Sequence, residues 1–257
     1  MLSYQRSARN TLYGGGGGFV VRRDQSGAPG VSGANALGGT SYQVSRRQTL
    51  SLQYAFTRYN YTGVFGNADS QMAGVGYGVI LNPRWKFSLM GGAYRVRRLQ
   101  TIRVALDPAV ALMLGQQSTS EVQQGVTYFG GGTARLEGNF RRSNIAFQYV
   151  RTSSAGNNIF LASRLDNAAT TYSYSLLRRC SVLLTGGYMH MATLGRNYQP
   201  LQQVVATGAV SYRLHSPFYL TATFSKRHML LDYTGRRPDT TLAMIGFGFS
   251  PNGVPLW

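Results

Sequence analysis

The side chains that carry catalysis in enzymes are few and scattered in this sequence of 257 residues. The three histidines, His190, His215 and His228, fall on separate expected strands or turns, with no spacing typical of a metal or acid–base site. Nearly all the carboxylates fall in expected loops or at loop edges: Asp24, Asp69, Asp107, Glu121, Glu137, Asp166, Asp232 and Asp239. An active site needs a nucleophile beside a base, or a group of carboxylates. We therefore expect no enzyme, no catalytic residue, no metal site and no cofactor.

Two further features offer no chemistry. The glycine run Gly14–Gly18 lacks the Lys-Ser/Thr pair of a phosphate-binding loop and does not begin a helix, so it predicts a smooth stretch of strand or a bend. Cys180 is the one cysteine of the chain and cannot form an internal disulfide.

Arginine is the abundant functional side chain. The formal net charge is +18, and lysine occurs only at Lys86 and Lys226. So basic a chain favours partners that bear phosphate or other anions, namely nucleic acid, anionic lipid or anionic solutes. A general bias toward arginine codons is the plainer explanation of the same composition.

The elements that must position these arginines are strands. In 49–57, Leu50, Leu52, Tyr54 and Phe56 alternate with small polar residues, which gives one apolar and one polar face. The pattern recurs and predicts 12 strands: 11–22, 34–45, 48–60, 70–81, 85–97, 124–137, 143–152, 159–176, 181–192, 202–214, 217–230 and 240–249. Residues 2–8 are either a further strand or an N-terminal strap.

The connections between these strands alternate in length. Short ones are expected near 46–47, 82–84, 138–142, 177–180 and 214–216, and longer ones near 23–33, 61–69, 98–123, 153–158, 193–201 and 231–239. Short turns at one end and long loops at the other are typical of an outer-membrane β-barrel. A soluble closed barrel is the alternative, but charged residues are only 13% of the chain, about half the usual share for a soluble domain. No window of about 18 apolar residues predicts a transmembrane helix.

We therefore expect one domain over 1–257, an all-β, transmembrane, antiparallel up-and-down barrel. Residues 1–10 form a strap or partial strand, and 250–257 form a C-terminal tail. Because such barrels have even strand numbers, either 12 strands close the barrel, or 14 do if the chain is truncated. The start Met1–Arg6 lacks the apolar segment of a signal peptide, so we expect that the signal was removed or that the true N-terminus lies upstream.

The long external loop 98–123 contains an expected helix near 108–114. Asp107-Pro108 supplies an N-cap and a first-turn proline, and Gly115 a stop. The helix is apolar all round, which predicts burial, either under the external loops or in the barrel mouth.

Basic residues recur at the outer ends of the five strands that run toward the long loops. The apolar face of each of these strands arrives at one of Arg58, Arg95, Arg151, His190 and Lys226. Arginine grips phosphate through a bidentate fork. One hypothesis is a belt that holds lipopolysaccharide phosphates, and the other is ordinary snorkelling to the interface.

The polar face predicts the lining of a lumen. It carries Gln53, Lys86, Arg135, Glu137, Gln148 and Arg213 among many small residues. Small polar side chains leave room for water, and a slight cationic excess favours anions. Alternatively, Arg135, Glu137 and their neighbours pair into a plug that only stabilises the barrel.

The alternating Gly/Tyr/Ser strands, the paired arginines of the short turns and the aromatic last strand resemble Gram-negative outer-membrane β-barrel proteins. The end Ile245–Trp257 resembles an Arg/Gly/Tyr-rich, largely uncharacterised subgroup that finishes in a short proline-containing tail with terminal Trp. The likeness covers about residues 30–257 and implies the outer membrane as location. It also implies that the barrel-insertion machinery recognises Phe247, Phe249 and Trp257, although Trp257 lies eight residues past Phe249. Proteins of the subgroup are usually longer at the N-terminus.

The favoured function is a narrow passive channel with mild anion preference that takes small anionic solutes. The alternative is a non-conducting structural or adhesion barrel whose external loops bind partners. A soluble nucleic-acid binder would need aromatic side chains beside arginines on one face. Here the aromatic residues share a face with Leu, Val and Ile, so no nucleic-acid partner is expected. The sequence does not predict the oligomeric state.

Overall fold

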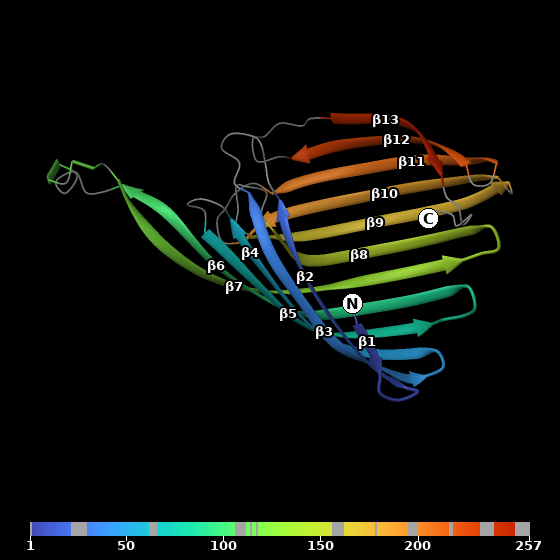
Figure 1. Cartoon of the computed structure of the whole chain (residues 1–257), viewed down its shortest axis with the longest axis horizontal. Helices are drawn as coiled ribbons and strands as arrows, with labels where there is room; N and C mark the ends of the chain where they lie inside the picture. The colour runs from blue at the N-terminus through green and yellow to red at the C-terminus, as the bar shows by residue number, and fades with distance from the viewer. Residues whose placement is uncertain are drawn as a thin grey trace.

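The computed structural model describes residues 2–21, 30–61, 66–105, 112–113, 115–116, 118–155, 162–177, 179–194, 200–215, 218–231 and 239–249. These residues form one antiparallel sheet of 13 strands in sequence order, curled into a trough (Figure 1). The strands are β1 Leu2–Gln5, β2 Asn10–Val21, β3 Val31–Ser45, β4 Gln48–Tyr61, β5 Gly66–Ile80, β6 Trp85–Ala105, β7 Ser118–Asn139, β8 Ser143–Ala155, β9 Ala162–Leu177, β10 Cys180–Thr193, β11 Leu201–His215, β12 Phe218–Leu231 and β13 Asp239–Phe249.

The all-β antiparallel fold predicted from the alternation is confirmed. Each of the 12 predicted strands has its counterpart in β2–β13, and the undecided segment 2–8 contributes β1 over Leu2–Gln5. The run Gly14–Gly18 lies within β2, as a smooth stretch of strand.

The alternation continues from strand to strand because antiparallel partners share a face. Leu50 on β4 lies opposite Tyr42 and Tyr77, and all three side chains are exposed on the outer, convex face. Similarly exposed apolar side chains lie along the other strands, among them Leu52, Tyr54, Val75, Leu89, Phe147, Leu184, Val204, Val210, Phe224 and Phe247. The inner face carries mostly Gly, Ser, Thr and Gln.

Glycines let aromatic rings lie flat on the inner face. A Cβ on Gly39 would lie 2.6 Å from the Tyr13 hydroxyl, and one on Gly131 would lie 2.5 Å from the Tyr94 ring. Tyr94 also stacks on Phe129, with ring centroids 5.0 Å apart. Packing of a ring over a neighbouring glycine pins the register of a curved sheet.

The sheet is open in the described part of the chain, because no ladder joins β1 to β13 there. With 13 alternating strands, β1 and β13 run in the same direction. Direct closure between them would be parallel, and antiparallel closure requires an even number of strands. Closure by 12 strands, with β1 as a strap, and closure by 14 strands both stay predictions.

The bounds predicted for the long loop 98–123 are wrong at both sides, because 98–105 belong to β6 and 118–123 to β7, which leaves 106–117 between them. β6 and β7 stay paired from Trp85 opposite Gly138 to Ala105 opposite Ser118, and this hairpin projects well beyond its neighbours (Figure 1). The reason is that β6 and β7 keep each other's backbone groups hydrogen-bonded after β5 and β8 have ended.

Most of the predicted helix 108–114 lies outside the described residues. Leu112 and Met113 are helical, but they are 86% and 89% exposed, so the expected burial is wrong for these two residues. The hairpin holds them away from the sheet. No helix in the described ranges is long and apolar enough to cross a membrane.

Candidate functional sites

A basic cavity lies on the inner face near the short-turn ends of β4–β7. Lys86 lies opposite Glu137, and Arg135 lies opposite Gln148. Arg135 also forms an ion pair with Glu137. The cavity has a volume of about 330 Å³ and is lined by Gln43, Arg46, Arg47, Thr49, Gly78, Val79, Ile80, Lys86, Phe87, Ser88, Arg135 and Glu137.

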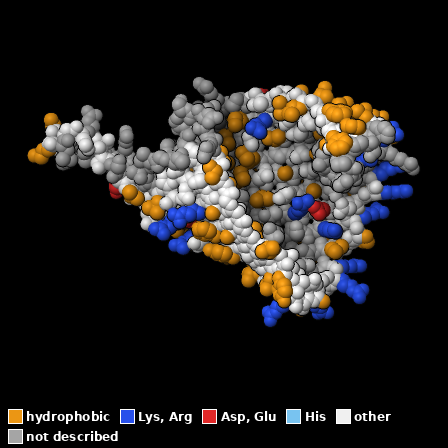
Figure 2. All heavy atoms as spheres, in the orientation of Figure 1, with side chains coloured by type: hydrophobic (Ala, Val, Ile, Leu, Met, Phe, Trp, Pro, Cys, Tyr) orange, Lys and Arg blue, Asp and Glu red, His pale blue; other side chains and the backbone are white. Residues whose placement is uncertain are grey.

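The balance of charge in this cavity is positive, because Arg46, Arg47, Lys86 and Arg135 line it together with the single carboxylate Glu137. Figure 2 looks into the hollow of the sheet and shows Lys and Arg side chains beside an acidic one. Closely spaced cations in a concave site raise the local concentration of anions. The ion pair offsets one of these charges and fixes Arg135 in place.

Three of the predicted lumen residues, Gln53, Gln148 and Arg213, do not line this cavity. Gln53 lies on the inner face of β4, opposite Gly39 and Gly74. Arg213 lies on the inner face of β11, opposite Tyr219. The structure thus brings together Lys86, Arg135 and Glu137, with Gln148 beside them in register.

The five residues of the predicted lipid-phosphate belt all lie on the outer face, toward the long connections. Arg58 on β4 forms an ion pair of 3.6 Å with Asp69 on β5. Arg95 lies opposite Gln71 and Tyr128, and Lys226 lies opposite Ala206 and Thr241. The remaining two, Arg151 and His190, meet at a carboxylate.

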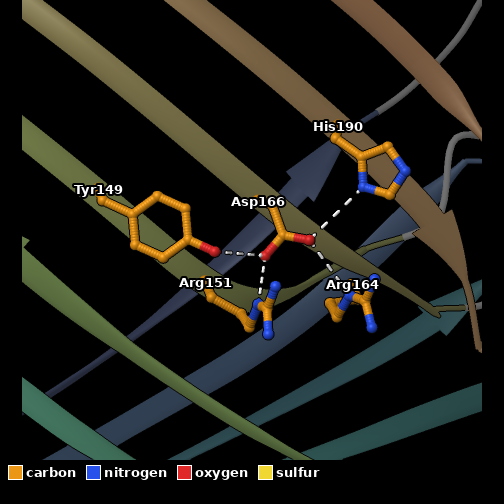
Figure 3. Close-up of polar contacts among 5 residues, drawn as sticks. All are labelled: Tyr149, Arg151, Arg164, Asp166 and His190. Atoms are coloured by element: carbon orange, nitrogen blue, oxygen red, sulfur yellow. Dashed lines mark hydrogen bonds and ion pairs between the residues drawn. The ribbon is translucent and has the colours of Figure 1, made fainter.

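Asp166 on β9 is the centre of a cluster of polar side chains on this outer face (Figure 3). Tyr149 Oη donates a hydrogen bond of 3.1 Å to Oδ1, and Arg151 donates to the same oxygen through Nε. Arg164 Nε donates to Oδ2 at 3.2 Å, and His190 Nδ1 lies 3.5 Å from Oδ2.

Arg151, Asp166 and His190 stand in line across β8, β9 and β10, because each lies directly opposite the next in the ladders. Asp166 is only 8% exposed although it lies on the outer face, since its neighbours cover it. The two guanidinium groups balance its charge with one positive charge in excess. Such a network fixes both arginines in one orientation.

Sequence reasoning missed Asp166, Arg164 and Tyr149. One signal was available: Arg164 and Asp166 are two residues apart in a predicted strand, so they share a face and lie within reach of each other. The other partners come from neighbouring strands, and only the register brings them there.

The predicted insertion residues Phe247 and Phe249 lie on the outer face of β13. Their rings surround Phe218 of β12, with centroid distances of 5.5 Å and 5.4 Å. Trp257 lies outside the described residues. Within the ranges that the structure describes, no three His, Cys, Asp or Glu side chains form a metal site.

The comparisons with known proteins concern the fold. The ferric yersiniabactin uptake receptor of Yersinia pestis superposes with a TM-score of 0.56 at 10% identity, over 98% of this chain and 50% of that receptor. The ferric enterobactin receptor of Pseudomonas aeruginosa gives a TM-score of 0.53 at 10% identity, over 95% of this chain and 43% of that receptor. The chain has the fold of an outer-membrane β-barrel wall. It spans half or less of the length of these receptors. No protein-family profile matches the sequence, and no curated protein does.

Proposed function

We propose that this chain lines a passive channel with mild anion preference in the outer membrane of a Gram-negative cell. The observation that carries the proposal is the basic inner-face cavity behind an apolar outer wall. In the wall of an outer-membrane barrel, the apolar outer face would contact lipid and the basic cavity would face the lumen.

The outer face supports the membrane location. Leu52, Val75 and Leu184 are each at least half exposed, and they lie among many exposed apolar neighbours on adjacent strands. Soluble monomers rarely expose continuous apolar patches larger than a few hundred Å². Lipid acyl chains would remove this surface from water, and the alternation then leaves the polar residues facing a lumen.

The inner face supports the anion preference. Arg46, Arg47, Lys86 and Arg135 surround one carboxylate, Glu137. Rings of basic side chains select anions in pores because they lower the electrostatic energy of an anion in the constriction.

The two lysines of the chain provide a matched test. Lys86 lines the inner cavity, whereas Lys226 lies on the outer face. The chain is refolded in detergent, its folding is confirmed by a heat-modifiable gel shift, and single-channel currents are recorded in a planar bilayer under a salt gradient. We expect an anion-side reversal potential that Lys86→Gln moves toward zero and Lys226→Gln leaves in place. Equal changes of the reversal potential in the two variants would mean that Lys86 does not line the pore.

The projecting hairpin β6–β7 favours the second candidate, a structural or adhesion barrel. It carries exposed apolar residues, including Leu112, Met113 and Val122, beyond the rest of the sheet. An inserted protein that conducts no current, and whose surface binding is lost when the hairpin beyond Leu99 is shortened, would support this alternative.

Two partners belong to the same proposal. The outer-face residues Arg58, Arg95, Arg151, His190 and Lys226 would contact lipopolysaccharide phosphates, and Asp166 would orient two of them. Phe247, Phe249 and Trp257 would be recognised by the barrel-insertion machinery. The first is tested by lipopolysaccharide retention after Arg95→Glu/Lys226→Glu, two residues that form no ion pair with a described residue. The second is tested by comparing how well the Phe249→Ala and Phe247→Ala variants assemble into the outer membrane of cells.

A further inference from the structure

A row of exposed arginines lines the end of the sheet where the turns are short. They are Arg6, Arg9, Arg46, Arg47, Arg84, Arg141, Arg142 and Arg179, here called the arginine rim. Figure 2 shows Lys and Arg side chains projecting along this edge. Among the described carboxylates, only Glu137 lies near this end, and it faces inward to Arg135. The rim therefore offers positive charge that no described acid of the chain neutralises.

Aromatic side chains stand directly behind the rim. Trp85 follows Arg84 in the chain, and its ring lies edge-on to Phe140, which precedes Arg141, at a centroid distance of 5.7 Å. Tyr174 is next to Ser175, whose backbone N–H donates to the carbonyl of Arg142.

The same arrangement recurs at the next turn along the sheet. Tyr212 on β11 precedes Arg213, whose backbone N–H donates at 2.7 Å to the carbonyl of Arg179. Tyr212 is 43% exposed on the outer face. Each described turn of this part of the sheet therefore pairs an outward aromatic side chain with an arginine one residue further toward the end.

We propose that the arginine rim binds the phosphate groups of anionic phospholipids in the adjoining leaflet, an inference that rests on the proposed membrane location. Trp and Tyr in membrane proteins collect at the level of the lipid headgroups. The turns are short, so the arginines lie within one or two residues of these rings, at a rise of about 3.3 Å per residue. Guanidinium groups at that level meet phosphate, which they bind in a bidentate fork.

The position of the rim arginines at the level of the lipid headgroups is the reason to favour lipid over other polyanions. A soluble nucleic acid or a cell-wall polymer would be reached by arginines that extend away from the interface on longer loops. The rim arginines instead sit on the tightest connections of the sheet, next to rings that pack on the outer face.

Trp85 provides a local reporter of the lipid at the rim. The chain has two tryptophans, so Trp257→Phe leaves Trp85 as the sole emitter. This variant is refolded from denaturant into phosphatidylcholine vesicles that contain either brominated phosphatidylglycerol or brominated phosphatidylcholine, at equal bromine content. The ratio of the two quenching efficiencies measures the preference for the anionic lipid beside Trp85.

We expect the brominated phosphatidylglycerol to quench Trp85 several-fold more strongly. Arg141→Gln/Arg142→Gln, which leaves the inner cavity intact, should lower the preference toward unity, by about fivefold for each arginine that contacts a headgroup. The matched control Arg97→Gln/Arg227→Gln also removes two positive charges, but from the long-connection end of the sheet. It should leave the ratio of quenching efficiencies unchanged.

Equal quenching by the two lipids in a protein that has inserted and conducts current would overturn this inference and leave the proposed channel standing. Failure of the chain to insert into any vesicle would overturn both. Loss of binding to peptidoglycan or nucleic acid in the Arg141→Gln/Arg142→Gln variant, with no lipid preference in the parent, would assign the rim to that polymer instead.

Discussion

The two ends of the sheet use arginine in opposite ways. At the long-connection end, some of the arginines on the outer face lie beside carboxylates, as in Arg58 with Asp69 and Arg151 with Asp166. At the short-turn end, the described rim arginines stand exposed without a carboxylate partner. The same residue type therefore ties strands together at one end and leaves its charge available to a partner at the other.

The difference follows from where each arginine sits. A residue within a strand has a directly opposite neighbour on each side, about 5 Å away, so a carboxylate there can pair with it. A residue in a two-residue turn such as Arg141-Arg142 has no such neighbour, and both of these arginines are exposed.

The largest effect is expected at Asp166. Asp166→Asn keeps the shape but removes the charge that balances Arg151 and Arg164, and should lower the free energy of unfolding by about 2 kcal/mol. Reversible urea unfolding in lipid vesicles measures it. Asp239→Asn is the control, since its side chain is 49% exposed and, among the described residues, pairs with His228 alone, and it should cost less than about 0.5 kcal/mol. Equal costs would mean that the cluster is no more than a set of surface pairs.

A double-mutant cycle sharpens the comparison within the long-connection end. The cycle of Arg151→Gln with Asp166→Asn should give a coupling free energy above about 1 kcal/mol, because the Asp166 side chain is only 11% exposed. The same cycle for Arg58 and Asp69, which lie 3.6 Å apart with the arginine side chain 49% exposed, should give less than about 0.5 kcal/mol. A reversed order would contradict the role given to Asp166.

The smallest effect is expected at the short-turn end. Arg141→Gln/Arg142→Gln should change the free energy of unfolding in phosphatidylcholine vesicles by less than about 0.5 kcal/mol, because exposed side chains without partners contribute little to stability. The same urea titration measures it. A clear loss of stability without anionic lipid present would show that these arginines serve the fold and not a lipid.

The strands were predictable because their signal is local. The segment predicted as 48–60 forms β4, Gln48–Tyr61, and the predicted 143–152 lies within β8, Ser143–Ala155. Face alternation also placed Lys86, Arg135 and Glu137 on the inner face and Arg151 and His190 on the outer face. The hairpin β6–β7 was missed because the residues beyond 98 lack a clear apolar face, and only pairing with each other makes them strands.

The sequence by itself determined which side chains share a face, since successive residues of a strand point to opposite sides. It also determined the short turns near 46–47, 82–84 and 138–142 and the arginines in them. The tertiary structure decided which side chains meet across strands. Asp166 stands between Arg151 and His190 because the register of β8, β9 and β10 sets them opposite one another. That register depends on pairing along whole strands and on the curvature of the sheet, to which residues far apart in sequence contribute together, so no single segment encodes it.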